Sequence, residues 1–248
     1  MKVLYLDIET APHRGLFWGT FKQNISIDMI EEPGYILCWA AKWEDKKEVL
    51  FSSVKKDGYE TMLHKMWALL DNADVVVHYY GKSFDIPWIN GQFAKLGLVP
   101  PSNYKQCDLC QEVRRNFKLA SSKLDFVLHY FGLGNKVKTP GVSMWKGCMA
   151  GDAKAWSQME RYNKQDVRVL PKLKKYMLPW IKWPAPLPLY AGDGDERACP
   201  NCGKHTLIKR GIEYPSKAAA YHRLKCTSCG TNARSRLAIK TQVKPGAV

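Results

Sequence analysis

The chain has 248 residues, of which 46% are hydrophobic and 12% aromatic, and its formal net charge is +15 at pH 7. This composition excludes a disordered chain, and the length suffices for one full hydrophobic core and a small second unit. No stretch approaches the ~18 apolar residues of a membrane-spanning helix. The first residues lack the basic-then-apolar order of a signal peptide. We therefore expect a cytoplasmic protein with reduced thiols and no membrane partner.

The positive charge is concentrated toward the C-terminus. From Arg197 onward the chain has eleven Lys or Arg residues and one acidic residue, Glu213, so ten of the fifteen net positive charges fall in the last 52 residues. A basic segment of this density favours a polyanionic partner, and nucleic acid is the simplest one. A basic surface that only keeps the protein soluble is the alternative.

Apolar runs and helical spacings predict the secondary structure in chain order. Strands are predicted over 2–10, 35–42, 49–52, 75–77 and 104–109. Helices are predicted over 58–73, 84–96, 122–131 and 152–178. We expect a capping box from Ser122 to Asp125, an N-cap at Asp152, and a bend or restart of the last helix at Pro171. Strands followed by alternating strand and helix predict an α/β fold with a mixed sheet flanked by helices.

A proline-rich stretch predicts the domain boundary. Residues 183–188 contain three prolines, and residues 191–196 are polar and rich in glycine and acids. Such a sequence is typical of a stiff, extended linker. We expect one domain over 1–182, a linker over 183–198 and a small β domain over 199–248.

Five residues form the predicted catalytic group. Asp7 and Glu9 lie two positions apart, so a strand places both on one face. Asp85 follows the predicted strand at 75–77, where parallel sheets bind their ligands. Tyr162 and Asp166 are four positions apart and share a helix face. Taken singly, Asp85 could be an acid that stabilises a helix N-terminus, and Asp166 could lie on a solvated helix face. Together they predict a shared cation site.

The charge of the four carboxylates indicates which cations they would bind. Four ionised carboxylates repel one another, and two Mg²⁺ or Mn²⁺ ions match their charge with the oxygen ligands that these ions prefer. Two such ions ~3.5–4 Å apart can hold an attacking hydroxide and a leaving oxygen across a phosphodiester. This pattern predicts hydrolysis of a nucleic-acid backbone.

Three segments resemble the motifs of a known family. Residues 6–10 (Leu-Asp-Ile-Glu-Thr), residues 81–85 (Gly-Lys-Ser-Phe-Asp) and the Tyr-x-x-x-Asp spacing of 162–166 resemble the DEDD 3′–5′ exonuclease superfamily, which has a ribonuclease H-like fold. The tyrosine of the third motif resembles the DEDDy branch. The similarity covers roughly residues 1–180 and is strongest to stand-alone exonucleases related to family B polymerase proofreading domains.

This resemblance implies a role for each acidic residue. It implies that Asp7, Glu9 and Asp166 bind the cation that carries the attacking water. It also implies that Asp7 and Asp85 bind the cation at the leaving 3′ oxygen, and that Tyr162 orients the water. The implied products are nucleoside 5′-monophosphates. Single-stranded DNA is the expected substrate, with RNA as the alternative.

Two regions are candidates for contact with the nucleic-acid strand. Family members usually have Asn before the glycine of the second motif, where this chain has Tyr80. We expect Tyr80 either to stack on a terminal base or to be an ordinary core aromatic. Residues 132–151 contain five glycines and no acid, so we expect a flexible basic loop in which Lys136, Lys138 and Trp145 contact the strand. A loop without such contacts is the alternative.

Two Cys-x-x-Cys pairs predict a zinc ribbon in the small domain. The four cysteines are Cys199, Cys202, Cys226 and Cys229, and a glycine follows each pair. Four thiolates suit one structural Zn²⁺. The 23 residues between the pairs exceed the usual ~15–20, which a long hairpin tip at 214–217 would accommodate. The expected phosphate contacts are Lys209, Arg210, Arg223, Lys225, Arg234 and Arg236. The remaining cysteines, Cys38, Cys107, Cys110 and Cys148, are expected to be free thiols.

The predicted function is therefore that of a metal-dependent 3′–5′ exonuclease with a zinc ribbon that binds nucleic acid. Two alternatives stay open. One is a non-catalytic nucleic-acid-binding accessory protein of replication or recombination, and the other is a structure-selective endonuclease on the same fold. A replication or repair protein is the expected protein partner.

Overall fold

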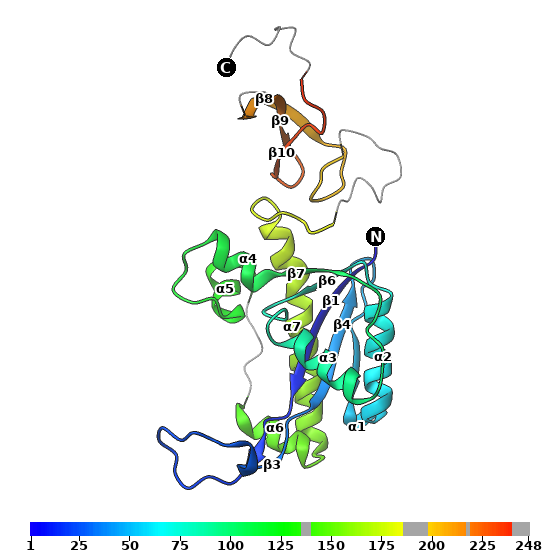
Figure 1. The fold of residues 1–248 in the computed structure, drawn as a ribbon, viewed down its shortest axis with the longest axis vertical. Coiled ribbons are helices and arrows are strands. Elements are labelled where there is room, and N and C mark those ends of the chain that lie inside the picture. The colour runs from blue at the N-terminus through cyan, green and yellow to red at the C-terminus, as the bar shows by residue number, and fades with distance from the viewer. Residues whose placement is uncertain (135–139, 186–197, 217–218, 240–248) are drawn as a thin grey trace. The chain divides into compact units, whose positions relative to one another are not determined.

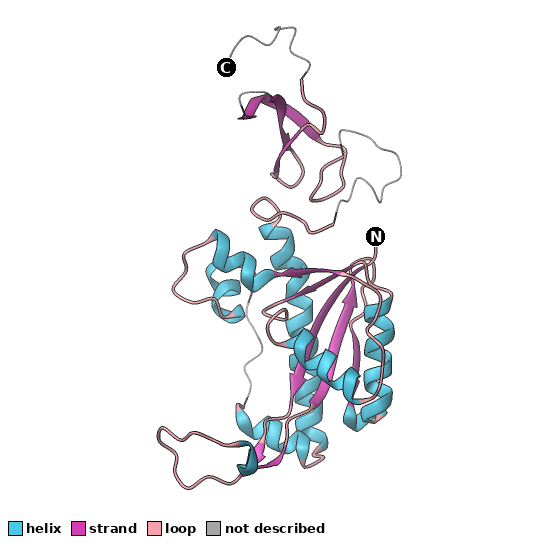
Figure 2. Cartoon of the chain, in the orientation of Figure 1, coloured by secondary structure: helices cyan, strands magenta, loops and turns pink. Residues whose placement is uncertain are grey.

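A computed structural model describes residues 1–134, 140–185, 198–216 and 219–239 of the chain. These residues divide into two compact units, one comprising Lys2–Leu173 and the other comprising Met1 with Lys174–Val248. The first unit holds the α/β layers and the second a small β-sheet (Figure 1, Figure 2). The predicted linker at 183–198 stays a prediction, because residues 186–197 are outside the described part of the chain.

A mixed five-stranded sheet forms the centre of the first unit, as predicted. Its strand order is β5-β4-β1-β6-β7, in which β1 runs parallel to β6 and antiparallel to β4. The strands are β1 (Val3–Thr10), β4 (Ile36–Trp43), β5 (Leu50–Ser53), β6 (Val75–His78) and β7 (Lys105–Asp108). All five predicted strands are confirmed to within one or two residues at each end.

Helices cover both faces of this sheet. The helices are α1 (Val54–Asp57), α2 (Tyr59–Asp71), α3 (Asp85–Lys95), α4 (Leu109–Asn116), α5 (Leu124–Tyr130), α6 (Val142–Met149) and α7 (Ala153–Met177). Leu4, Leu6 and Ile8 of β1 pack in one core cluster with α2 and α3. A second cluster joins β4 with α6 and α7. The period-2 alternation of β1 therefore directs Asp7 and Glu9 away from the α2–α3 layer.

Three predictions about helices are wrong. α7 does not restart at Pro171 but runs through it, and Leu170, Leu173 and Met177 remain buried along the same helix. Ser122 forms no capping box, since α5 begins after Lys123 and has no side-chain cap. The segment 132–151 is not a loop throughout, because its apolar residues form α6. The predicted N-cap is confirmed, as the Asp152 carboxylate accepts from the amide nitrogen of Ala155 at 3.0 Å.

A short hairpin follows β1 in the first unit. Its strands are β2 (Arg14–Gly15) and β3 (Ile30–Glu32), with a 3-10 turn at Ile27–Met29 before β3. In Figure 1 the dark-blue segment between these strands extends away from the sheet and its helices.

The second unit contains an antiparallel sheet in the order β10-β9-β8. Its strands are β8 (Leu207–Ser216), β9 (Ala219–Cys226) and β10 (Asn232–Arg234). The buried Asn201 side chain joins the first cysteine pair to the segment before it. Its Nδ2 donates to the carbonyls of Leu178 at 2.8 Å and Ile181 at 2.5 Å, and its Oδ1 accepts from the amide of Trp183 at 3.1 Å. Among the described helices, none has the length and apolar character that crossing a bilayer requires.

Candidate active site

Three carboxylates from distant parts of the sequence come together beside β1. Asp7 and Glu9 extend from β1, and Asp166 extends from α7. Each offers one carboxylate oxygen, and these oxygens all lie within 4.8 Å of one another. Asp166 is buried, whereas Asp7 and Glu9 are half-buried. Like charges this close repel unless a cation lies among them, so the group is consistent with a site for a divalent ion.

Asn163 holds the first of these carboxylates in place. Its side chain is fully buried, and its Nδ2 donates to Oδ2 of Asp7 at 2.6 Å. Asn163 lies one turn before Asp166 on α7, so the same helix positions two members of the group. The sequence pattern did not indicate this residue, because an Asn inside a helix has no distinctive signature.

Asp85 lies beside this group but is not one of the three clustered carboxylates. It is the first residue of α3, is 4% exposed, and its Oδ1 accepts from the amide nitrogen of Ile8 at 3.1 Å. Ile8 is the residue between Asp7 and Glu9, so the bond fixes Asp85 against the acidic end of β1. Burial raises the pKa of Asp85 to about 7, although the amide hydrogen bonds oppose the shift. A nearby cation would favour the charged form.

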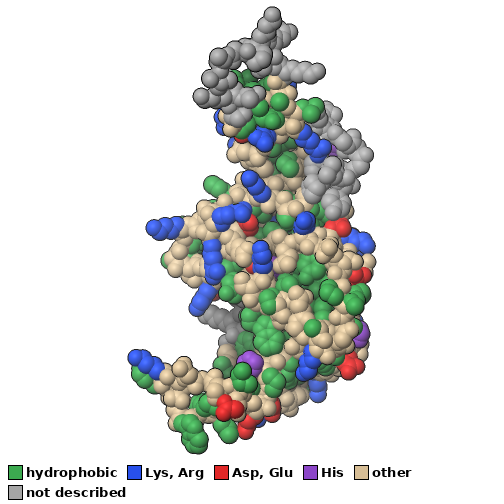
Figure 3. Space-filling view, in the orientation of Figure 1, with side chains coloured by type: hydrophobic (Ala, Val, Ile, Leu, Met, Phe, Trp, Pro, Cys, Tyr) green, Lys and Arg blue, Asp and Glu red, His purple; other side chains and the backbone are tan. Residues whose placement is uncertain are grey.

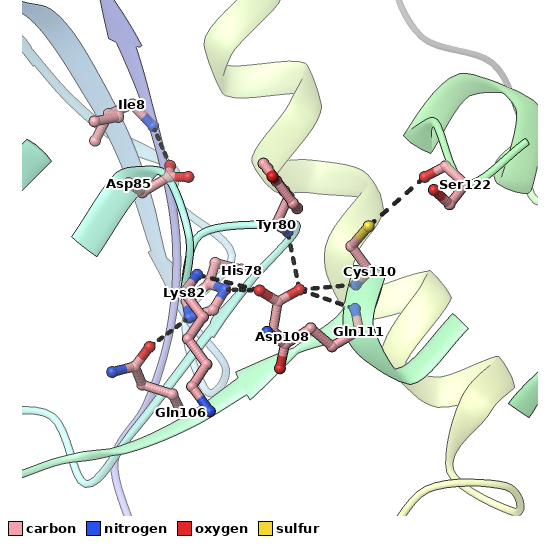
Figure 4. A network of polar contacts seen from close by, with 10 residues as sticks. All are labelled: Ile8, His78, Tyr80, Lys82, Asp85, Gln106, Asp108, Cys110, Gln111 and Ser122. Atoms are coloured by element: carbon pink, nitrogen blue, oxygen red, sulfur yellow. Dashed lines mark hydrogen bonds and ion pairs between the residues drawn. The ribbon is translucent and has the colours of Figure 1, made fainter. Parts of the chain in front are cut away.

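A third buried carboxylate, that of Asp108, organises the turn that precedes Asp85 (Figure 4). Its Oδ1 accepts from the amide of Tyr80 at 2.9 Å, and its Oδ2 accepts from the amide of Lys82 at 3.1 Å. The same Oδ1 caps α4 by accepting from the amides of Cys110 and Gln111. Asp108 therefore joins the β6–α3 turn to the end of β7.

Asp108 also faces a histidine. His78 is fully buried, its Nδ1 lies 3.6 Å from Oδ2 of Asp108, and its Nε2 lies 3.1 Å from Oε1 of Gln106. Burial lowers the pKa of His78 below its usual value, and the nearby Asp108 opposes this shift. Adjacent packing explains Gly81, because a Cβ there would lie 2.5 Å from Cγ of His78.

Asp108→Asn is expected to lower the free energy of unfolding by about 1.5–3 kcal/mol, because the new amide NH₂ would face the N–H of Lys82. The turn that carries Asp85 would then loosen, and any activity of the acidic site should fall with stability. Chemical denaturation and an activity assay at a temperature where the variant is folded measure both effects. Asp71→Asn is the matched control, since Asp71 bonds the exposed amide of Ser102 away from this turn. Full activity of the Asp108 variant would contradict the positioning role.

Tyr80 has an unusual backbone conformation. Its φ is +67°, a left-handed value that Asn adopts more readily than Tyr. The Tyr80 side chain is 43% exposed, and the guanidinium of Arg114 lies 5.2 Å from its ring centroid. Tyr80 is thus an exposed aromatic rather than a core residue.

Tyr162 lies next to Trp145, one of the residues that are predicted to contact the nucleic-acid strand. Their ring centroids are 6.2 Å apart in an edge-on arrangement, and both rings are half-buried in the cluster that joins α6 with α7. Tyr162 and Asp166 are on the same face of α7, one turn apart. Lys136 and Lys138 are outside the described residues.

The four cysteines of the second unit form one cluster. Their sulfur atoms all lie within 4.8 Å of one another, with 3.6 Å between Cys199 and Cys229 and 3.7 Å between Cys202 and Cys226. Zn–S bonds of ~2.3 Å in a tetrahedron require sulfur atoms about 3.8 Å apart. The donor set and its spacing suit zinc. Burial raises the pKa of Cys202 to about 11. At Cys226 burial also raises the pKa, but hydrogen bonds, the largest from Thr206, outweigh it and lower the pKa to about 6.

Three of the six predicted phosphate contacts gather on one face of this small sheet. Arg223 and Arg234 are directly opposed on β9 and β10, and with Arg210 they line a concavity of 780 Å³. Arg234 lies 4.6 Å from the ring centroid of Tyr221. Lys209, Lys225 and Arg236 are exposed but do not line this concavity.

Comparison with known families decides the classification. The family model of the RNase_H superfamily matches residues 31–178, more than half of the chain. The chain belongs to the ribonuclease H superfamily. The matched stretch contains Asp85 and Asp166, and β1 with Asp7 and Glu9 precedes it.

Two solved structures are similar to this ribonuclease H superfamily member. The family B DNA polymerase from the hyperthermophilic archaeon Pyrobaculum calidifontis has a TM-score of 0.54 and 20% identity, over 72% of this chain and 24% of the polymerase. RNase D from Trypanosoma brucei has a TM-score of 0.46 and 18% identity, over 70% of this chain and 56% of the enzyme. The chain thus spans about a quarter of the polymerase and just over half of RNase D. No curated protein matches the sequence.

Proposed function

We propose that this protein is a metal-dependent 3′–5′ exonuclease that degrades single-stranded DNA to nucleoside 5′-monophosphates. The observation that carries the proposal is the cluster of Asp7, Glu9 and Asp166, whose oxygens lie within 4.8 Å of one another. Asp85, held against the amide of Ile8, completes the four-acid set. Membership of a superfamily of nucleases supports a phosphodiester substrate.

The carboxylates fit hard divalent cations. A site whose protein ligands are all carboxylate oxygens suits Mg²⁺ or Mn²⁺ better than zinc. Asp7, Glu9 and Asp166 would hold one ion, and Asp7 with Asp85 a second. Such ions supply an ionised water and neutralise charge that develops on the phosphate. Asn163 keeps Asp7 oriented, and Tyr162 would hydrogen-bond the attacking water.

The second unit would hold the strand through its phosphates. Arg210, Arg223 and Arg234 present three guanidinium groups around one concavity, and Arg readily forms bidentate bonds with phosphate. Glu213 is an acidic residue of that lining, and its carboxylate lies 4.0 Å from Arg234. We propose that zinc binding by the cysteine cluster keeps this sheet folded.

Incubation with a 5′-labelled single-stranded oligonucleotide and Mg²⁺ tests the proposal. We expect a ladder of products shortened from the 3′ end, release of mononucleotides, and no cleavage of a circular strand. An RNA strand of the same sequence measures the preference for DNA. Internal cuts in the circle would support an endonuclease instead. Tight binding without cleavage in either Mg²⁺ or Mn²⁺ would support a non-catalytic accessory protein.

Tyr162→Phe is expected to lower the turnover rate by roughly 10²-fold, because the phenolic hydroxyl would no longer assist proton transfer from the attacking water. The edge-on contact of the ring with Trp145 is retained in this variant, so stability should change little. Single-turnover kinetics and a thermal melt measure the two quantities separately. Tyr176→Phe, on the same helix and outside the acidic group, is the matched control. An unchanged rate would assign Tyr162 to packing alone.

A further inference from the structure

The segment between β2 and β3 exposes six large apolar side chains. We define residues 16–29 as the aromatic arm. Its exposed large hydrophobic side chains are Leu16, Phe17, Trp18, Phe21, Ile25 and Ile27. Trp18 is 97% exposed and Phe21 is 80% exposed. Figure 3 shows hydrophobic side chains on this projection. Exposed apolar groups concentrated in one short segment indicate a binding surface.

The base of the aromatic arm is firmly held, so the exposure is not that of a frayed end. The Arg14 guanidinium bonds both oxygens of Glu32, at 2.8 and 2.9 Å. The amide of Leu16 donates to the carbonyl of Met29 at 2.9 Å. Gly15 is required at this crossing, because a Cβ there would lie 2.2 Å from the carbonyl oxygen of Met29. The hairpin therefore presents the aromatic side chains from a fixed stem.

A line of rings leads from this stem to the acidic site. Nδ1 of His13 accepts from the amide of Gly34 at 2.9 Å, and the His13 ring lies 6.2 Å from that of Trp88. Trp88 lies 6.3 Å from Phe84, which is 39% exposed and directly precedes Asp85. This row of rings runs from the stem of the arm to the first residue of α3, and its exposed members, His13 and Phe84, offer faces on which bases can stack.

The charge of the aromatic arm indicates which part of a nucleic acid it would bind. Lys22 and Asp28 are its only charged residues, so the arm is neutral. Lys22 lies over the ring of Phe21 at 5.3 Å, and Asp28 bonds the hydroxyl of Ser26. A neutral arm cannot bind phosphates strongly, but its rings can stack on bases of any sequence. The row of rings that leads toward Asp85 favours a nucleic-acid strand over a protein as the partner of the arm.

We propose that the three aromatic rings of the arm, those of Phe17, Trp18 and Phe21, form a base-stacking surface that binds unpaired nucleotides of the strand whose end lies at the acidic site. This inference rests on the proposed function. Its contribution should depend on bases and be insensitive to salt. The contribution of the concavity lined by Arg210, Arg223 and Arg234 in the second unit should instead depend on phosphates and weaken as salt is added.

The test uses the full-length chain with Asp7→Asn, so that the strand is bound but not cut. Fluorescence anisotropy measures the affinity for a labelled single-stranded oligonucleotide and for an abasic strand of the same length. Trp18→Ala combined with Phe21→Ala should weaken binding of the normal strand by roughly tenfold or more. Binding of the abasic strand and the slope of affinity with salt should not change. Ile25→Ala combined with Ile27→Ala, on the same arm, is the matched control and should have little effect.

Four other outcomes would overturn the inference. The normal and abasic strands could bind equally to the starting protein, the aromatic double variant could bind the normal strand as tightly as that protein, or the aliphatic control could lose as much affinity as the aromatic variant. Sedimentation could also show a dimer that the aromatic variant converts to a monomer, which would make the arm an interface between two copies. If the protein binds the strand but the aromatic and aliphatic variants of the arm have equal affinities, the proposed nuclease function is unaffected. Arm-dependent binding without any cleavage by the wild type would refute the nuclease function alone.

Discussion

Asp7→Asn is expected to reduce Mg²⁺-dependent cleavage by about three orders of magnitude, because a lost cation site removes several kcal/mol of transition-state stabilisation. Asp7 is the central ligand of the proposed site, as it would contact both ions. The Asn side chain keeps the size of Asp and can still bond Asn163, whose Nδ2 lies 2.6 Å from Oδ2 of Asp7. The fold should therefore persist, and the loss should be chemical rather than structural.

A measurement without substrate checks the same site. Mn²⁺ or Mg²⁺ should raise the Tm of the wild type, by an amount equivalent to about 2.7 kcal/mol at a hundred times the Kd. Asp7→Asn should lose most of this rise. Without cations the variant should melt at or above the wild-type temperature, since one of three mutually repelling carboxylates is gone. Asp45→Asn, at an exposed surface position, is the control. Wild-type cleavage or an unchanged cation response in the Asp7 variant would refute the assignment.

The sequence predicted the elements of the first unit because their apolar patterns are strong and local. Val3–Leu6 and Val75–Val77 are continuous runs of buried apolar residues, which are typical of strands buried on both faces of a sheet. The same periodicities placed Asp7 beside Glu9, and Tyr162 one turn from Asp166. Convergence of Asp7 and Glu9 with Asp166 follows once α7 packs on the face of the sheet opposite the α2–α3 layer.

Features that depend on long-range polar contacts were not predictable. Asn163 and Asp7 are 156 positions apart, and Asp108 bonds the turn at Tyr80 across 28 positions. No local pattern marks such pairs, because any buried Asn or Asp needs partners and the sequence does not name them. The capping box at Ser122 failed for the same reason, since the hydroxyl of Ser122 instead accepts from Nε of Arg114 at 3.0 Å.

The small domain shows how far spacing alone can lead. Two Cys-x-x-Cys pairs were enough to predict a four-cysteine cluster, because each pair presents two sulfurs from one tight turn. The long interval between them is taken up by β8 and β9, whose pairing is irregular between Lys209 and Ile212. That irregularity is why the sequence could not tell which basic side chains share the face of Arg223 and Arg234.

Cys226→Ser is expected to abolish zinc binding and unfold the second unit while leaving the first unit folded. Cys226 is fully buried, and its sulfur lies 3.7 Å from that of Cys202, so a serine oxygen would replace a central ligand with a poor one. Zinc binding contributes on the order of 10–16 kcal/mol in finger peptides, far more than this small sheet can recover from its own packing. The core clusters of the first unit do not include any residue of the cysteine cluster.

Loss of the second unit should change binding in a specific way. Affinity for a long single strand should fall, and its dependence on salt should become shallower, because fewer phosphates are neutralised. Hydrolysis of a short strand at saturating concentration should persist. Zinc content, limited proteolysis and binding at several salt concentrations measure these effects, with Ser228→Ala in the same turn as the control. EDTA cannot replace the variant, since it removes both kinds of metal. A variant that holds stoichiometric zinc would show that Cys226 is not an essential ligand. A variant that keeps the wild-type salt dependence would show that phosphate binding by Arg210, Arg223 and Arg234 does not depend on the cysteine cluster.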